Sequence, residues 1–235
     1  MISLFLLLLA LFGRANGTVD TPANKVQTVI FDFGNVVVQK DTRLVEAFLS
    51  QELEISEETA KEILKDRKEA LLQGNEDKTF FKSIFKNFGK EMPSSFLKQF
   101  KKEIKGSILI DKKVFKIIQA LKKQKNLILF SNTEKHKADL YKELGYYEPF
   151  EQLILSYEIG LRKPQKEAYQ FVIETIGVEP GSCLFIDDKL ENILVAKKQS
   201  WNAIWFHDAD QLEKELYDLG FRLNCDPTGD ETAPF

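Results

Sequence analysis

Short apolar runs alternate with helical segments through the second half of the chain, and this alternation most constrains the fold. Beyond Gly106 the pattern predicts helices over 112–123, 134–144, 165–176, 190–199 and 211–219, with strands over 126–130, 152–156, 183–186 and 203–206 between them. Such alternation requires a parallel sheet with right-handed crossovers. An earlier apolar run, ending at Asp32, adds a further buried strand. The predicted fold class is therefore α/β, with a three-layer, Rossmann-like parallel sheet as its core.

A long segment between the first strand and the rest of the sheet is predicted to be entirely helical. We expect helices over 42–53, from Ser56 as N-cap to about Gly74, over 78–88, and from Pro93 to Gly106. The predicted organisation is a core at 25–40 and 107–222, a helical insertion at 41–106 and a flexible tail at 223–235.

The third predicted helix carries two regular stripes. One is aromatic and aliphatic at spacings of three and four, which predicts a buried face: Phe81, Ile84, Phe85 and Phe88. The other is a row of lysines at i, i+4: Lys78, Lys82, Lys86 and Lys90. Like charges at that spacing cost a few tenths of a kcal/mol each. The row indicates either a positive surface that attracts an anionic substrate or an ordinary solvated helix face.

Asp32 ends a buried apolar strand, and the carboxyl ends of strands form the ligand crevice of open α/β sheets. Aspartate can act there as a covalent nucleophile that carries a phosphoryl group. An acidic residue after a strand also serves as a turn or helix-capping residue. Asp32 alone therefore leaves both interpretations open.

Three further apolar runs end in polar clusters of the same form. Ser131-Asn132-Thr133 offers a hydroxyl and an amide that can hold phosphoryl oxygens, although Thr133 is also well placed to cap the following helix. In Gly160-Leu161-Arg162-Lys163-Pro164, proline keeps Lys163 out of helical geometry, so Lys163 is either a fixed cation or a solvated turn residue.

The last run ends in two adjacent carboxylates, Asp187 and Asp188, with Glu191 and Asn192 following. Together with Asp32 they can hold Mg²⁺, a hard cation that prefers oxygen ligands. Adjacent acids also cap helices and open turns. Asp187 and Asp188 therefore indicate a metal site only in combination with the other three segments.

These four motifs, in this order, resemble the haloacid dehalogenase-like (HAD) hydrolase superfamily over roughly residues 26–207. Within it, Phe-Asp-Phe-Gly-Asn-Val, Phe-Ser-Asn-Thr, Gly-Leu-Arg-Lys-Pro and Ile-Asp-Asp-Lys-Leu-Glu-Asn resemble the bacterial α-D-glucose-1-phosphate phosphatase-like subgroup. The resembling families insert a helical cap where this chain has residues 41–106.

The resemblance implies a Mg²⁺-dependent phosphatase that forms an aspartyl-phosphate on a small substrate, most simply a sugar phosphate. It makes Asp32 the nucleophile, with Ser131 and Lys163 stabilising the transferring phosphoryl group. Asn132 and Arg162 are expected to bind substrate. The expected metal ligands are Asp32, the Gly34 carbonyl, Asp187 and Asp188.

Gly34 departs from the pattern of most phosphatases of the superfamily, which have a second Asp there as general acid and base. Positioned acid–base catalysis is typically worth about 10²- to 10⁴-fold. The resembling subgroup also has Gly, so a good leaving group such as an anomeric oxygen would need less help. Dehalogenases lack that Asp too, but they have an aromatic residue in its place and need no metal, whereas this chain has Asp187-Asp188.

Composition fits one α/β core with an insertion: 235 residues, 43% hydrophobic, net charge −3. The charge does not indicate a nucleic-acid partner. Two cysteines and two histidines cannot build a Cys/His zinc site of the usual spacing, so any metal should be bound by oxygen. Cys183 lies in a predicted buried strand and Cys225 in the tail, which favours free thiols over a disulfide.

The N-terminal residues 1–17 read as a signal peptide, since the apolar run is too short to span a bilayer and small residues follow it at a signal-peptidase spacing. An uncleaved anchor or a wrong start is the alternative. The signal predicts export to a periplasm or lumen, without stable membrane insertion after cleavage. Without it, the enzyme would be cytoplasmic.

Two other functions fit the same residues. One is a catalytically silent protein that binds an anion or a protein through the same pocket or the lysine-rich cap, for which Gly34 is the best support. The other is a non-phosphatase hydrolase of the superfamily, such as a dehalogenase.

Overall fold

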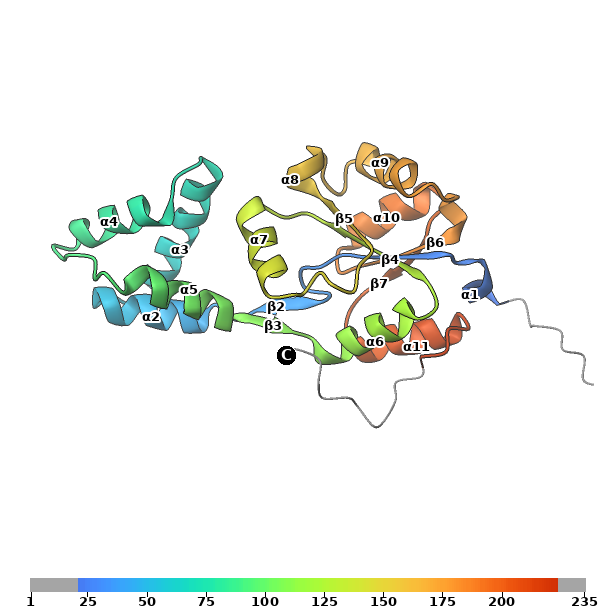
Figure 1. Ribbon diagram of the computed structural model, residues 1–235, viewed down its shortest axis with the longest axis horizontal. Coiled ribbons are helices and arrows are strands. Elements are labelled where there is room, and N and C mark those ends of the chain that lie inside the picture. The colour runs from blue at the N-terminus through green and yellow to red at the C-terminus, as the bar shows by residue number, and fades with distance from the viewer. Residues whose placement is uncertain (1–20, 224–235) are drawn as a thin grey trace, which may run out of the picture.

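The protein has an α/β core and a separate group of four helices, joined by two narrow strands (Figure 1). The structure is a computed structural model and describes residues 21–223. The predicted signal segment, Cys225 and the tail beyond Leu223 lie outside the described residues.

A five-stranded parallel sheet forms the centre of the core, in the order β5-β4-β1-β6-β7. The strands are β1 (Thr28–Phe31), β4 (Asn126–Ser131), β5 (Gln152–Leu155), β6 (Cys183–Asp187) and β7 (Asn202–Trp205). Strand β1 is central, and its Phe31 pairs with Leu129 of β4 and with Ile186 of β6. The loops after these three strands therefore leave the sheet at the same edge.

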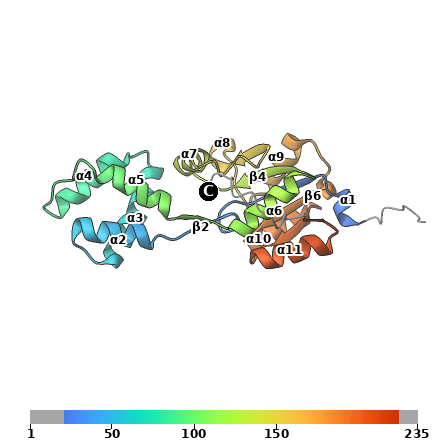
Figure 2. The same ribbon diagram turned by 60° about the horizontal axis from the view of Figure 1, so that its bottom comes forward.

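Helices cover both faces of the sheet, as Figures 1 and 2 show. The strand residues alternate accordingly: Val29 and Phe31 of β1 are packed on one face, with residues of α6, α7 and α11, while Ile30 is packed on the other face, with residues of α9 and α10. These helices are α6 (Lys112–Lys122), α7 (Lys135–Glu143), α9 (Lys166–Ile176), α10 (Leu190–Lys198) and α11 (Ala209–Asp218). The predicted three-layer α/β class is confirmed.

Three short helical turns complete the core, and none of them was predicted. They are α1 (Pro22–Lys25), α8 (Ser156–Ile159) and the 3₁₀ turn η1 (Pro180–Ser182). Turns of this length carry too few residues to show a helical period in the sequence. The last residue of the predicted strand 152–156, Ser156, begins α8 instead.

The inserted segment is helical as predicted and forms the cap. Its helices are α2 (Arg43–Leu53), α3 (Glu57–Leu72), α4 (Asp77–Asn87) and α5 (Phe96–Gly106). Ser56 caps α3, because its hydroxyl oxygen accepts a hydrogen bond from the Thr59 N–H at 3.1 Å.

The cap has its own aromatic core. Phe81 lies edge-on to Phe96 and Phe100, with ring centroids 5.0 and 4.6 Å apart, and Phe85 lies against Phe96 at 4.9 Å. The predicted buried stripe of α4 is wrong at its end: Phe88 is 41% exposed. It is the C-cap residue and follows Asn87, the last residue of α4.

Two strands that the sequence did not predict connect the cap to the core. Strands β2 (Val38–Lys40) and β3 (Ile108–Ile110) pair antiparallel, with Lys40 opposite Ile108. Three residues are too few to establish a period of two, and their partners are far apart in sequence. The chain thus enters and leaves the cap through one narrow ribbon.

Cys183 is buried and has a free thiol, as expected. Among residues 21–223, no helix has the length and apolar character needed to cross a membrane.

We expect Phe81→Ala to destabilise the cap by about 3–5 kcal/mol, because a fully buried ring is replaced by a cavity. Phe88→Ala is the matched control on the same helix and should cost less than about 1 kcal/mol. Urea unfolding followed by far-UV circular dichroism measures both. Equal losses would contradict an aromatic cap core centred on Phe81.

Candidate active site

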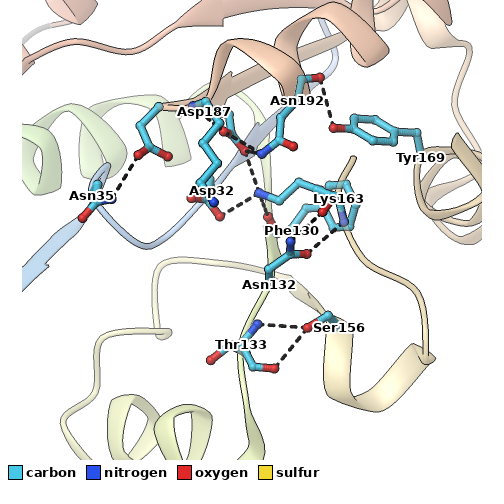
Figure 3. Close-up of polar contacts among 12 residues, drawn as sticks. Asp32, Asn35, Phe130, Asn132, Thr133, Ser156, Lys163, Tyr169, Asp187 and Asn192 are labelled. Carbon is cyan, nitrogen blue, oxygen red and sulfur yellow. Dashed lines mark hydrogen bonds and ion pairs between the residues drawn. The ribbon is translucent and has the colours of Figure 1, made fainter. Parts of the chain in front are cut away.

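Three predicted motifs meet at the carboxyl edge of the sheet (Figure 3). Asp32 follows β1, while Ser131 and Asp187 end the neighbouring strands β4 and β6. All three are buried, although Asp32 keeps 9% of its surface exposed. The parallel register alone places these side chains side by side, at the point where Lys163 reaches in from the loop between α8 and α9.

The Lys163 ammonium is the hub of the site. Its Nζ donates to Asp32 Oδ1 at 2.7 Å, to Asp187 Oδ2 at 2.7 Å and to the Phe130 carbonyl at 2.8 Å. An ammonium has three donors, and all three are used. Nζ also lies 5.1 Å from the ring centroid of Phe130 and 5.2 Å from that of Phe185. The predicted fixed cation is therefore present, and it is buried.

Burial and charge act against each other on this pair. Burial raises the pKa of Asp32 to about 6, although the Lys163 ammonium opposes the shift. Burial alone would lower the pKa of Lys163, but the Asp32 and Asp187 carboxylates outweigh it and raise that pKa. Lys163 thus stays cationic, and this charge favours the ionised form of Asp32.

Asn132 holds the Lys163 loop in place. Its Nδ2 donates to the Lys163 carbonyl at 2.8 Å, and its Oδ1 accepts from the Lys163 N–H at 2.9 Å. The Lys163–Pro164 peptide bond is cis. In this geometry Asn132 positions Lys163, and its substrate-binding role stays a prediction.

Arg162 is not brought into the cluster. It is exposed, and its backbone N–H is bonded to Gln165 Oε1 at 2.8 Å, which closes the turn before α9. Its predicted substrate contact remains a prediction as well.

Thr133 does not cap α7. Its N–H donates to Ser156 Oγ at 3.0 Å, and the Ser156 hydroxyl donates to the Thr133 carbonyl at 3.1 Å. The N-cap residue of α7 is Glu134, whose side chain makes no capping bond. The capping explanation for the Ser131-Asn132-Thr133 motif is therefore wrong, because Thr133 is fastened to α8 instead.

Asp187 is fully buried, and both of its carboxylate oxygens accept hydrogen bonds. Asn192 Nδ2 reaches both of its oxygens at 2.9 Å, and the Lys189 N–H donates to Oδ1 at 2.8 Å. Asn192 is itself held by Tyr169, whose hydroxyl donates to the Asn192 carbonyl at 3.0 Å. Sequence reasoning noted Asn192 without giving it a role. Its place in the first turn of α10, five residues after Asp187, was the available signal.

Asp188 faces the loop that follows Asp32. Asn35 Nδ2 donates to Asp188 Oδ2 at 3.0 Å, and the Trp205 indole N–H donates to the Asp188 carbonyl at 2.9 Å. Asn35 has a positive φ of 60°, which Asn tolerates better than most residues. Neither residue was given a role from the sequence, although Asn35 belongs to the Phe-Asp-Phe-Gly-Asn-Val motif.

The space beside Gly34 is open. A Cβ built on Gly34 would meet no heavy atom within 4 Å, and its φ is not in the left-handed region. The backbone therefore accepts a larger residue at the place where most related phosphatases have Asp.

The donor set fits a divalent cation. Asp32, Asp187 and Asp188 each offer a carboxylate oxygen, and these oxygens lie within 4.8 Å of one another. Oxygen ligands of this kind suit Mg²⁺. Since Asp187 is engaged by Lys163, Asn192 and Lys189, Asp32 and Asp188 are the carboxylates with most free capacity.

Comparison with known proteins agrees with the family resemblance of the four motifs. A family model of haloacid dehalogenase-like hydrolases matches residues 26–198. D-ribitol-5-phosphate phosphatase of Bacteroides thetaiotaomicron is 28% identical over 210 residues, covering 81% of this chain and 97% of that protein. A flavin mononucleotide hydrolase of Arabidopsis thaliana is 42% identical over 65 residues, but the match spans only 26% of its length.

Solved structures share the fold. A HAD family enzyme of Bacteroides thetaiotaomicron, in complex with magnesium and inorganic phosphate, has a TM-score of 0.58 at 22% identity and covers 80% of this chain and 98% of its own. A HAD phosphatase of Thermococcus onnurineus has a TM-score of 0.55 at 19% identity, covering 81% and 98%. With its parallel sheet, helical cap and four motifs, the chain belongs to the haloacid dehalogenase-like hydrolase family.

Proposed function

We propose that the protein is a Mg²⁺-dependent phosphatase that hydrolyses a small phosphorylated metabolite, a sugar or polyol phosphate, through an aspartyl-phosphate on Asp32. One observation carries the proposal. Asp32 is one of three carboxylates that lie close enough together to hold one metal ion, and one of its oxygens accepts a hydrogen bond from the buried Lys163 ammonium. That arrangement leaves the other oxygen of Asp32 for attack on phosphorus.

The chain's own residues would divide the reaction between them. An Asp32 oxygen attacks phosphorus, the bond from phosphorus to the ester oxygen breaks, and the departing oxygen takes its proton from solvent water. Water then attacks the phosphorus of the aspartyl-phosphate, which releases phosphate and restores the carboxylate. Lys163 and Ser131 stabilise the charge on the transferring group. Mg²⁺, held by Asp32, Asp188, Asp187 and the Gly34 carbonyl, would offset the repulsion between substrate and carboxylates.

The relatives support a phosphate ester as substrate. One relative, matched over 97% of its length, is a D-ribitol-5-phosphate phosphatase, and a protein of related fold was crystallised with magnesium and inorganic phosphate. A catalytically silent binding protein is less consistent with the site. Lys163 is paired with Asp32, and the amides of Asn132 and Asn192 hold the charged residues in place.

The nucleophile is tested by Asp32→Asn, which keeps the shape of the side chain and removes its charge. Mg²⁺-dependent hydrolysis of p-nitrophenyl phosphate should fall by at least about 10³-fold, because the reacting group itself is lost. Asp218→Asn, at the exposed end of α11, should leave the rate and melting temperature unchanged. Full activity of Asp32→Asn would refute the covalent mechanism.

The metal ligands are tested by a pair of acidic residues three apart. Asp188→Ala should raise the Mg²⁺ concentration for half-maximal rate by about 10- to 100-fold. Glu191→Ala, in the exposed first turn of α10, should change it by less than about twofold. A metal titration of activity measures both, and equal shifts would mean that the ligands are misassigned.

Gly34 leaves the departing oxygen without the usual proton donor. The rate should therefore fall steeply as the leaving-group pKa rises across a series of substituted aryl phosphates, and sugar 1-phosphates should react faster than the 6-phosphates of the same sugars. Gly34→Asp has room for its side chain and should speed poor leaving groups by at least about tenfold. A flat dependence in the wild type would show that another group already supplies the proton.

A further inference from the structure

A cavity lies between the cap and the core, outside the carboxylate cluster. Its volume is about 600 Å³, and its walls come from α3 and α5 of the cap, from the linker strands and from α7. Figure 1 shows α7 on the side of the core that faces the cap. Leu64, Phe100 and Tyr141 supply apolar wall, which is enough surface to hold the body of a small metabolite.

Cations from both bodies line this cavity. The basic residues of the lining are Arg67 and Lys68 from cap helix α3, Lys101 from cap helix α5, Lys40 from linker strand β2, and His136 and Lys137 from α7. The acidic ones are Asp77, Asp139 and Glu143. The row of lysines on α4 that the sequence singled out does not contribute to the lining. Three of these six basic residues therefore belong to the cap helices and three do not.

Some of these cations are already neutralised. Arg67 makes a two-pronged ion pair with Asp77, at 2.6 and 2.9 Å, and Lys137 pairs with Glu134. Lys40 and Lys68 make no ion pair within residues 21–223. An anion entering the cavity would therefore meet two uncompensated ammonium groups, one on each side of the junction.

The electrostatics show that these charges feel one another across the junction. Burial lowers the pKa of Lys40 to about 8, and repulsion from Lys137, Lys68 and Arg67 contributes, with Glu134 opposing. Burial, Lys137 and Arg67 likewise lower the pKa of His136, with Glu134 and Asp77 opposing. Lys101 and Lys105 of cap helix α5 pair with Glu143 of α7 and already join cap and core, whereas Lys40 and Lys68 lie in the same cavity without such a partner among the described residues.

We propose that Lys40 and Lys68 form an anion-binding site across the cap–core junction, which takes a phosphate or carboxylate group of a small molecule and adds to the contacts between cap and core. The bound anion would replace ammonium–ammonium repulsion by charge-assisted hydrogen bonds. The site stands apart from the carboxylate cluster, since it shares no residue with it.

The two sites are nevertheless neighbours. Tyr141 lines the cavity, and its ring lies 4.8 Å from the ring of Phe33, the residue after Asp32. The anion has two possible sources, a second anionic group of the substrate or a free anion. Only the first source rests on the proposed function.

Isothermal titration with inorganic phosphate in excess EDTA tests the site directly. Without Mg²⁺ the Asp32, Asp187 and Asp188 carboxylates repel phosphate, so the remaining binding reports the cavity. The Lys40→Gln/Lys68→Gln double variant should bind phosphate at least about tenfold more weakly than the wild type. Lys65→Gln removes a charge from the same helix α3 outside the cavity and should bind as the wild type does. Lys68→Gln alone, on the exposed cap surface, guards against misfolding of the double variant.

Kinetics with Mg²⁺ then separate the two sources. If the substrate supplies the anion, the kcat/KM ratio of glucose 1,6-bisphosphate to glucose 1-phosphate should fall at least about tenfold in the double variant and stay constant in Lys65→Gln. A constant ratio with weakened phosphate binding assigns the site to a free anion.

The anion site is overturned if the wild type binds no phosphate in EDTA, or if the double variant binds it equally well. Absence of turnover on every ester would refute the proposed phosphatase, yet the titration in EDTA would still decide the anion site.

Discussion

The buried Lys163 ammonium is the interaction on which the site depends. Burying a lone charge costs several kcal/mol, and here two carboxylates, a carbonyl and two aromatic faces surround it. The positive charge of this ammonium also offsets the repulsion between the Asp32 and Asp187 carboxylates. Removing Lys163 would leave two buried carboxylates side by side without a counter-charge.

The parallel sheet supplies the geometry for this cluster. Strand β1 lies between β4 and β6, and equal register brings their last residues to one edge. Side-chain amides then fix what the sheet leaves free. Asn132 holds the loop of Lys163, Asn192 holds Asp187, and Asn35 holds Asp188. None of these amides carries charge, so they position the ionised groups without changing the charge balance.

The cap is a separately packed body. Its aromatic cluster shares no residue with the two clusters of the core, and the ribbon of β2 and β3 carries the chain across. A narrow connection of this kind lets the charges on facing surfaces influence how cap and core meet. Lys40 and Lys68 make no ion pair within residues 21–223, and Glu134 offsets only part of the repulsion that Lys40 feels from the neighbouring cations.

The sequence by itself determined the α/β class, the helical insertion and the identity of the charged motif residues, because periodicity and the residues at strand ends are local properties. It could not show that Asn132 clamps Lys163, that Asn35 reaches Asp188 or that Phe88 is exposed, since each depends on segments distant in sequence. The pairing of β2 with β3 and the cation cluster between cap and core were likewise decided by the tertiary structure. Such contacts arise only when packing brings remote side chains within hydrogen-bonding or Coulombic range, and no local pattern encodes that distance.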